Sequence, residues 1–122
     1  MKPLLAICAA LALTASALAA EPPADAKAAC TKLLSAIGSG DYAAFVADGD
    51  AAFSALEKER FDSVVAQLSP RLKAGHEVTY LGELKQQGYQ VTLWKLSFRD
   101  GSDDALATLS LKNGKVGGFW IK

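Results

Sequence analysis

The chain has 122 residues, with 13 basic and 13 acidic side chains and one histidine. This length suits a single domain, and the balanced charge argues against nucleic acid as a partner, because phosphate binding needs a clustered positive surface. With one histidine and two cysteines, one of them in the first ten residues, we expect no metal site and no cofactor.

Residues 1–20 have the pattern of a signal peptide. Lys2 supplies a short positive region, residues 4–13 are an apolar run, and Ala17 and Ala19 form a small-residue cleavage motif. The run is too short to remain as a membrane anchor. We therefore expect export to the periplasm or the medium, cleavage after Ala19 or Ala20, and no membrane association afterwards. The part that remains, residues 21–122, is predicted to be one domain.

The first half of this part predicts three helices. Asp25 can cap a helix that ends at Gly38, and Asp41 can cap a second, short helix that ends before residues 48–50. A third helix is expected from about residue 53 to Gly75. Its apolar positions recur at spacings of three and four: Phe53, Leu56, Phe61, Val64, Val65, Leu68 and Leu72.

Cys30 is the one cysteine that remains after signal cleavage. It shares a helical stripe with Leu33, Leu34 and Ile37, so it is expected to be a small buried hydrophobic residue. The alternative is a reactive thiol or an intermolecular disulfide.

After Gly75 the apolar period changes to two, which is typical of strands. Strands are expected before the turn at residues 86–88, over 89–99, over 105–112 and over 115–122. In the second of these the apolar phase slips, from odd positions up to Leu93 to even positions from Trp94 onward. Either a bulge lies near Trp94 or both faces of this strand are covered.

Asn113 and Gly114 form a strong signal for a two-residue hairpin turn. Regular pairing from this turn puts Trp120 opposite Ala107, in the core. Three large apolar residues then fall on the other face: Leu106, Phe119 and Ile121. These three residues together indicate either an exposed patch or a homodimer through the sheet.

Helices followed by an antiparallel meander indicate an α+β fold, with three helices packed on one face of a curved four-stranded sheet. Four segments resemble the nuclear transport factor 2-like superfamily with the cystatin-like fold, and in particular its bacterial branch of small exported domains. They are Gly40-Asp41-Tyr42, Phe61-x-x-Val64, Leu81-Gly82 and Gly114-Lys115-Val116-x-Gly118-Phe119. The resemblance implies a cone of sheet and helices, often with a pocket at its open end and often dimeric through the sheet. Only residues 47–52 are available for the hairpin usual between the second and third helices, which implies a shallower or closed pocket.

The expected function is a non-enzymatic binding or protein-interaction module for a small apolar or anionic ligand or another exported protein. The alternative, suggested by the resemblance, is a cofactor-free enzyme of the ketosteroid isomerase type that uses an aspartate and a tyrosine. Asp48-Gly49-Asp50 is equally well explained as a turn, and the aromatic residues as core. Lys95 would be a cation inside the cone only if a bulge turned it inward. The pocket candidates are Tyr42, Phe45, Asp48, Asp50, Tyr80, Trp94 and Lys95.

Overall fold

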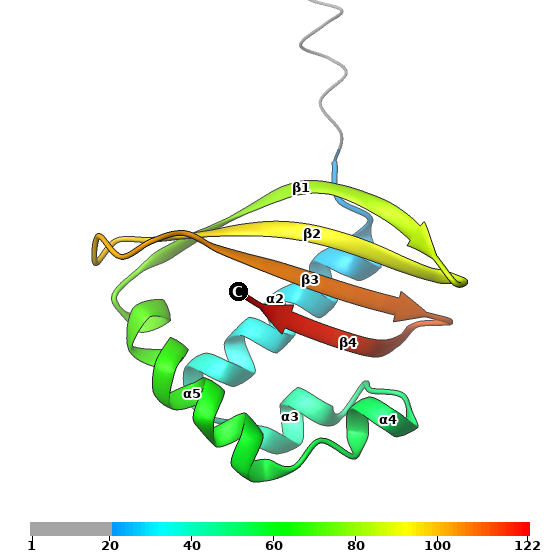
Figure 1. Cartoon of the computed structure of the whole chain (residues 1–122), viewed down its shortest axis with the longest axis horizontal. Coiled ribbons are helices and arrows are strands. Elements are labelled where there is room, and N and C mark those ends of the chain that lie inside the picture. The colour runs from blue at the N-terminus through cyan, green and yellow to red at the C-terminus, as the bar shows by residue number, and fades with distance from the viewer. Residues whose placement is uncertain (1–20) are drawn as a thin grey trace, which may run out of the picture.

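The computed structural model describes residues 21–122, and the predicted signal peptide at residues 1–20 lies outside this part. The described residues form four helices followed by four strands (Figure 1). The elements are α2 (Ala24–Ser39), α3 (Tyr42–Val46), α4 (Ala51–Ser54), α5 (Lys58–Lys73), β1 (His76–Gln86), β2 (Tyr89–Phe98), β3 (Ala105–Lys112) and β4 (Lys115–Ile121). The strands form one antiparallel sheet in the order β1-β2-β3-β4. The predicted α+β class with a four-stranded antiparallel sheet is confirmed.

Helix α2 ends, and helix α3 begins, at residues whose side-chain type explains the boundary. Helix α2 continues through Gly38 and ends at Gly40, which has a φ of 71°. The predicted end at Gly38 was therefore two residues too early, because the residue that takes the left-handed conformation is Gly40. Asp41 caps α3 as expected, since its carboxylate accepts a hydrogen bond from the Ala44 amide at 3.0 Å.

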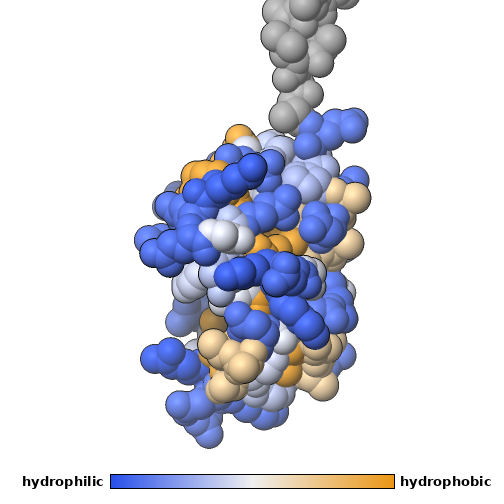
Figure 2. Space-filling model, turned by 90° about the vertical axis from the view of Figure 1, so that its right-hand side faces the viewer, coloured by the Kyte–Doolittle hydropathy of each residue, from blue (hydrophilic) through white to orange (hydrophobic). Residues whose placement is uncertain are grey.

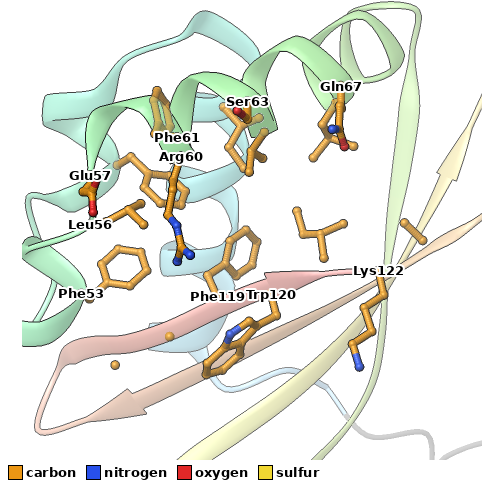
Figure 3. Close-up of a pocket in the computed structure, with 18 of the residues that line it drawn as sticks. Phe53, Leu56, Glu57, Arg60, Phe61, Ser63, Gln67, Phe119, Trp120 and Lys122 are labelled. Carbon is orange, nitrogen blue, oxygen red and sulfur yellow. The ribbon is translucent and has the colours of Figure 1, made fainter.

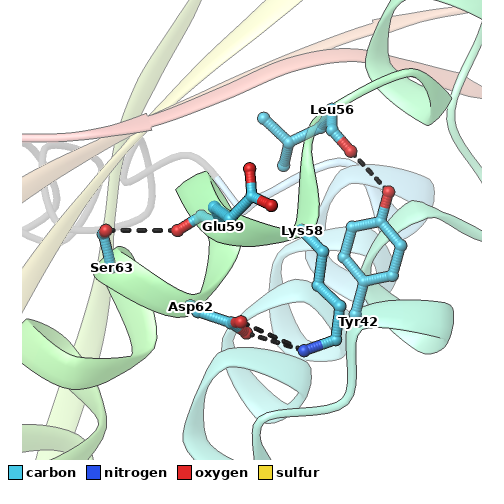
Figure 4. Close-up of polar contacts among 6 residues, drawn as sticks. All are labelled: Tyr42, Leu56, Lys58, Glu59, Asp62 and Ser63. Carbon is cyan, nitrogen blue, oxygen red and sulfur yellow. Dashed lines mark hydrogen bonds and ion pairs between the residues drawn. The ribbon is translucent and has the colours of Figure 1, made fainter.

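The expected third helix is two helices. Asp50 caps α4 by accepting from the Phe53 amide at 2.8 Å, and the chain leaves the helical path before α5 begins. The Tyr42 hydroxyl donates to the carbonyl of Leu56 in this break (Figure 4). The apolar spacing did not reveal the break, because Phe53 and Leu56 still pack against the same core as Phe61.

Both tight hairpins of the sheet have two-residue turns. Asn113 and Gly114 have φ values of 53° and 77°, and Gln87 and Gly88 have 53° and 82°. Two consecutive residues with positive φ are the mark of a type I′ turn. The hairpin predicted at Asn113-Gly114 is confirmed.

The register of β4 differs from the expected one. Val116 pairs with Leu111 but Gly118 pairs with Ser110, which leaves Gly117 as an extra residue in β4. Such a bulge moves every later side chain to the other face. The expected faces of β4 were therefore wrong: Phe119 and Ile121 pack against the core, and Trp120 is 54% exposed.

Strand β2 pairs with β3 without irregularity, and the bulge on its other side lies in β1, between Tyr80 and Gly82. The apolar residues of β2 therefore change from odd to even positions because both faces of this strand are covered, and not because β2 has a bulge. Trp94 lies on the face that receives the helices, and Val91, on the opposite face, is still buried. Lys95 is on that opposite face and exposed, so it does not enter the interior.

The core lies between the sheet and the helices. Its most completely buried side chains are Phe61, Ile37, Leu96, Leu109, Thr92 and Cys30. Cys30 is thus a packed core residue, as its helical stripe predicted, and burial raises the pKa of its thiol to about 12. Because only the thiolate is a good nucleophile, a buried, protonated thiol is inert.

We expect Cys30 to resist iodoacetamide in the native protein at about pH 8 and to react fully in guanidinium chloride. Mass spectrometry of the Cys30 peptide measures both rates. Native and denatured rates within about tenfold of each other would contradict the buried position.

The same burial predicts a loss of stability in alkali. The pKa of the Cys30 thiol is raised from 9.0 to about 12 in the fold, so its contribution is complete below pH 9 and is lost as the pH rises toward 12. Between these values the free energy of unfolding falls by about 1.4 kcal/mol per pH unit from this group alone. Denaturation of Cys30→Ala measured beside the parent should lack this part of the slope.

Candidate functional site

A groove of about 1040 Å³ lies between β4 and the helices α4 and α5. Figure 3 shows side chains of all three elements turned toward it, with α5 on one side and β4 on the other. In Figure 1 the same elements lie along the β4 border of the sheet. Helices α4 and α5 and the last strand, β4, therefore form one concave surface.

Four phenylalanines form the apolar base of the groove, which we call the aromatic floor: Phe45, Phe53, Phe61 and Phe119. The Phe45 ring lies 5.2 Å from Phe53, 5.0 Å from Phe61 and 6.4 Å from Phe119, measured between ring centroids. These distances are those of favourable aromatic pairs. The floor is a connected packed cluster, so it can receive an apolar group without rearranging.

One face of α5 forms the first wall. Arg60, Val64 and Gln67, spaced by four and three residues, lie on the same side of the helix and line the groove. We call these three residues the α5 wall. Arg60 extends from the helix across the groove toward β4 (Figure 3). Val64 belongs to the apolar stripe of the helix but is 40% exposed.

Arg71 closes one end of the groove. Its guanidinium lies 3.9 Å from the centre of the Phe98 ring and donates to the Ser102 hydroxyl at 3.0 Å and to the Asp103 carbonyl at 2.6 Å. Ser102 in turn donates to Asp100 through its hydroxyl and its backbone N–H, which lowers the pKa of that carboxyl. Arg71 is therefore engaged in holding the 99–104 loop against α5.

The backbone edge of β4 forms the second wall. Leu106 and Lys122 exchange both backbone hydrogen bonds, at 3.0 Å each. Because such pairs alternate along antiparallel strands, the N–H and C=O groups of Phe119 and Ile121 point away from β3, toward the groove. Val116 uses this same edge to bond to Asp48 and Asp50, both at 2.9 Å. Among the described residues no backbone hydrogen bond outside the sheet reaches Phe119 or Ile121.

Of the seven pocket residues predicted from the sequence, Phe45 lines this groove and the others do not. Tyr42 packs edge-on against Phe61, with 5.7 Å between ring centroids, and holds the turn after α4 (Figure 4). Asp48 forms an exposed ion pair with Lys32 at 2.7 Å. Asp50 caps α4. These aspartates and Tyr42 thus make their hydrogen bonds to other partners than each other.

The remaining three candidates belong to the sheet. Tyr80 and Trp94 pack together with ring centroids 5.1 Å apart, and the Trp94 indole donates to Thr92 at 2.9 Å. Lys95 lies on the opposite face and is exposed. The structure therefore gives Trp94 and Tyr80 a packing role and keeps Lys95 apart from both.

The outer face of the sheet, which is turned away from the helices, carries a second apolar surface. Leu84, Leu106 and Trp120 are 39%, 39% and 54% exposed there. The Trp120 ring lies against Gly118, where an added Cβ would come within 2.0 Å of the indole. Leu106 is on this face as expected for an interface candidate, whereas Phe119 and Ile121 are on the inner face.

The end of the domain with the two hairpin turns offers no comparable surface. Figure 2 shows it as mostly hydrophilic, with small separated hydrophobic patches. Its turn residues are exposed and polar: Gln86, Gln87, Lys112, Asn113 and Lys115. This end therefore lacks an apolar surface comparable with the groove or the outer face.

No family model and no curated protein matches this chain. Residues 21–122 contain no group of three histidine, cysteine, aspartate or glutamate side chains placed to hold a metal ion. No helix in that range is long and apolar enough to cross a membrane.

Proposed function

We propose that this chain is an exported binding module and that the groove between β4 and α5 is its binding site. The observation that carries the proposal is Val64, an apolar residue that is 40% exposed and lines the same groove as the aromatic floor. Water at such a concave apolar surface is released when a ligand covers it, which is the main driving force of most binding. Export is proposed from the signal pattern of residues 1–20.

The groove suits a ligand with an apolar body and a polar acceptor. The aromatic floor would cover the apolar part, and the five N–H donors of Arg60 suit an anionic or carbonyl oxygen. Glu57, Asp103 and Asp104 also line the groove, so its overall charge is mixed. Specificity would therefore come from placement of polar groups along the walls rather than from a strong field.

We further propose that the domain belongs to the nuclear transport factor 2-like superfamily with the cystatin-like fold. The order of helices followed by a four-stranded meander supports this assignment. The short connection between α3 and α4 departs from the usual pattern of the superfamily, because it leaves no room for the early hairpin. Fold membership alone does not decide the function.

The apolar, anionic fluorophore anilinonaphthalene sulfonate tests the proposed site. We expect saturable fluorescence enhancement by the native protein, and about tenfold weaker binding by Val64→Asp, because a carboxylate at the groove repels the sulfonate and adds polar surface. Val78→Asp is the matched control: Val78 is also 40% exposed but lies on β1, at the other side of the sheet. Equal weakening by both variants, or by neither, would contradict the proposal.

A homodimer through the outer face is a second candidate, favoured by the exposed side chains Leu84, Leu106 and Trp120. Sedimentation equilibrium should then show a dimer that the double variant Leu106→Lys, Trp120→Lys dissociates by about a hundredfold in Kd, because two apolar anchors become charged. A parent protein that stays monomeric at about 0.1 mM would exclude this assembly.

A further inference from the structure

We infer that the ligand of the groove is an extended peptide that adds to the free edge of β4 as a fifth strand. The inference rests on the proposed function of the groove as a binding site. Strand addition to an open sheet edge is a common mode of peptide recognition. Its requirements are an unpaired backbone edge, space beside that edge and pockets for alternate side chains.

The unpaired edge is at Phe119 and Ile121. The backbone N–H and C=O groups of both residues point into the groove, because the neighbouring residue Lys122 is bonded to β3. Two residues at this spacing offer two donors and two acceptors, which is the repeat of a strand. An extended peptide is the ligand whose own groups match this row.

The chain's own loop already uses this edge at its first position. Asp48 accepts from the Val116 amide and Asp50 donates to the Val116 carbonyl, so that Gly49 and Val116 form a parallel bridge. At Asp50 the chain turns away into α4. This edge of β4 therefore already pairs with a segment on the groove side at Val116. Beyond Val116, within the described residues, its backbone groups have no such partner.

The α5 wall can form hydrogen bonds with the backbone edge of an added strand that faces away from β4. Arg60 offers donors, and the amide of Gln67 offers a donor and an acceptor. Both side chains line the groove, and Figure 3 shows Arg60 reaching across it toward β4. Within residues 21–122 neither side chain has a hydrogen-bond or ion-pair partner in the protein. A peptide between the walls would have partners for both of its backbone edges.

The aromatic floor determines which side chains the bound peptide must carry. Successive side chains of a strand point to opposite faces, so every second one would meet the aromatic floor on the side of Phe53 and Phe119. Those positions must be apolar, while the alternate ones face solvent. The ligand class is therefore an extended segment with apolar residues at every second position.

The probes are three acetylated hexapeptides in which threonine alternates with valine, leucine or phenylalanine. We expect at least one to shift the backbone amide signals of Phe119 and Ile121 in nuclear magnetic resonance titrations and to slow their hydrogen exchange. The same peptide with every backbone nitrogen methylated should bind about tenfold more weakly or not at all, because its N–H donors are removed.

Ile121→Pro removes the N–H that points into the groove but leaves the hydrogen bonds between β3 and β4 intact, since those use the neighbouring residues. We expect it to weaken peptide binding by about tenfold, against less than about threefold for the matched variant Ile121→Ala. Far-ultraviolet circular dichroism checks that both variants fold. Equal losses from the two variants would overturn the strand pairing.

The fluorophore separates this inference from the proposed function. If the fluorophore binds and Val64→Asp weakens it, but none of the three peptides shifts Phe119 or Ile121 at about 1 mM, the strand inference is overturned and the binding groove stands. If the fluorophore also fails, the proposed function falls with it. A parent dimer that Ile121→Pro dissociates would overturn the inference by showing that a second copy of the chain occupies the edge.

Discussion

Replacing Phe61 by alanine is expected to lower the free energy of unfolding by about 3–5 kcal/mol. Phe61 is 1% exposed and joins α5 to α3. Its ring contacts Phe45 on α3 and packs edge-on against Tyr42, at 5.0 and 5.7 Å between centroids. The cavity left by the ring is enclosed by these rigid neighbours, so it cannot collapse cheaply.

Urea denaturation followed by circular dichroism measures this loss. Phe53→Ala is the matched control, because Phe53 belongs to the same cluster but is only partly buried, and we expect it to lose no more than about half as much. If Phe61→Ala cost less than about 1.5 kcal/mol, the packing of α5 on α3 described above would be wrong.

The two tryptophans are expected to respond in opposite ways. Trp94→Ala should cost about 3–5 kcal/mol, because the indole is 3% exposed, packs on Tyr80 and donates to Thr92. Trp120→Ala should cost less than about 1 kcal/mol, because more than half of that side chain is in water.

Acrylamide quenching of the single-tryptophan variants provides an independent measurement. The fluorescence of Trp94 in Trp120→Phe should be shielded, and that of Trp120 in Trp94→Phe should be quenched strongly. The reverse order would restore the register without a bulge, in which Trp120 faces the helices.

Features set by neighbouring residues were predictable from the sequence. Asp41 could be identified as a helix cap, and Asn113-Gly114 as a type I′ turn, because each depends on a few residues in a row. The faces of β4 were not, because the prediction extended regular pairing through Gly117. Two successive glycines inside a strand are a signal for a bulge, and giving it weight would have placed Phe119 and Ile121 correctly.

The candidate site was harder to predict than the fold. Phe45 was found because aromatic residues on a short helix must pack somewhere, but Arg60 was left out of the pocket candidates and Val64 was assigned to the apolar stripe of the third helix. Both choices were locally reasonable. The groove lies between α5 and β4, and the distance between a helix and a strand so far apart in sequence is set by the packing of the whole domain. A partial signal was available, since Arg60, Val64 and Gln67 share one helix face.

The most direct test of the groove as a binding site is to map anilinonaphthalene sulfonate on the protein by nitrogen–proton correlation spectra. Binding there predicts that the largest saturable shifts fall on the amides of Phe53, Val64 and Phe119. Shifts concentrated on Leu84, Val91 and Leu106 would move the site to the outer face, and the absence of any saturable shift would contradict the proposed function.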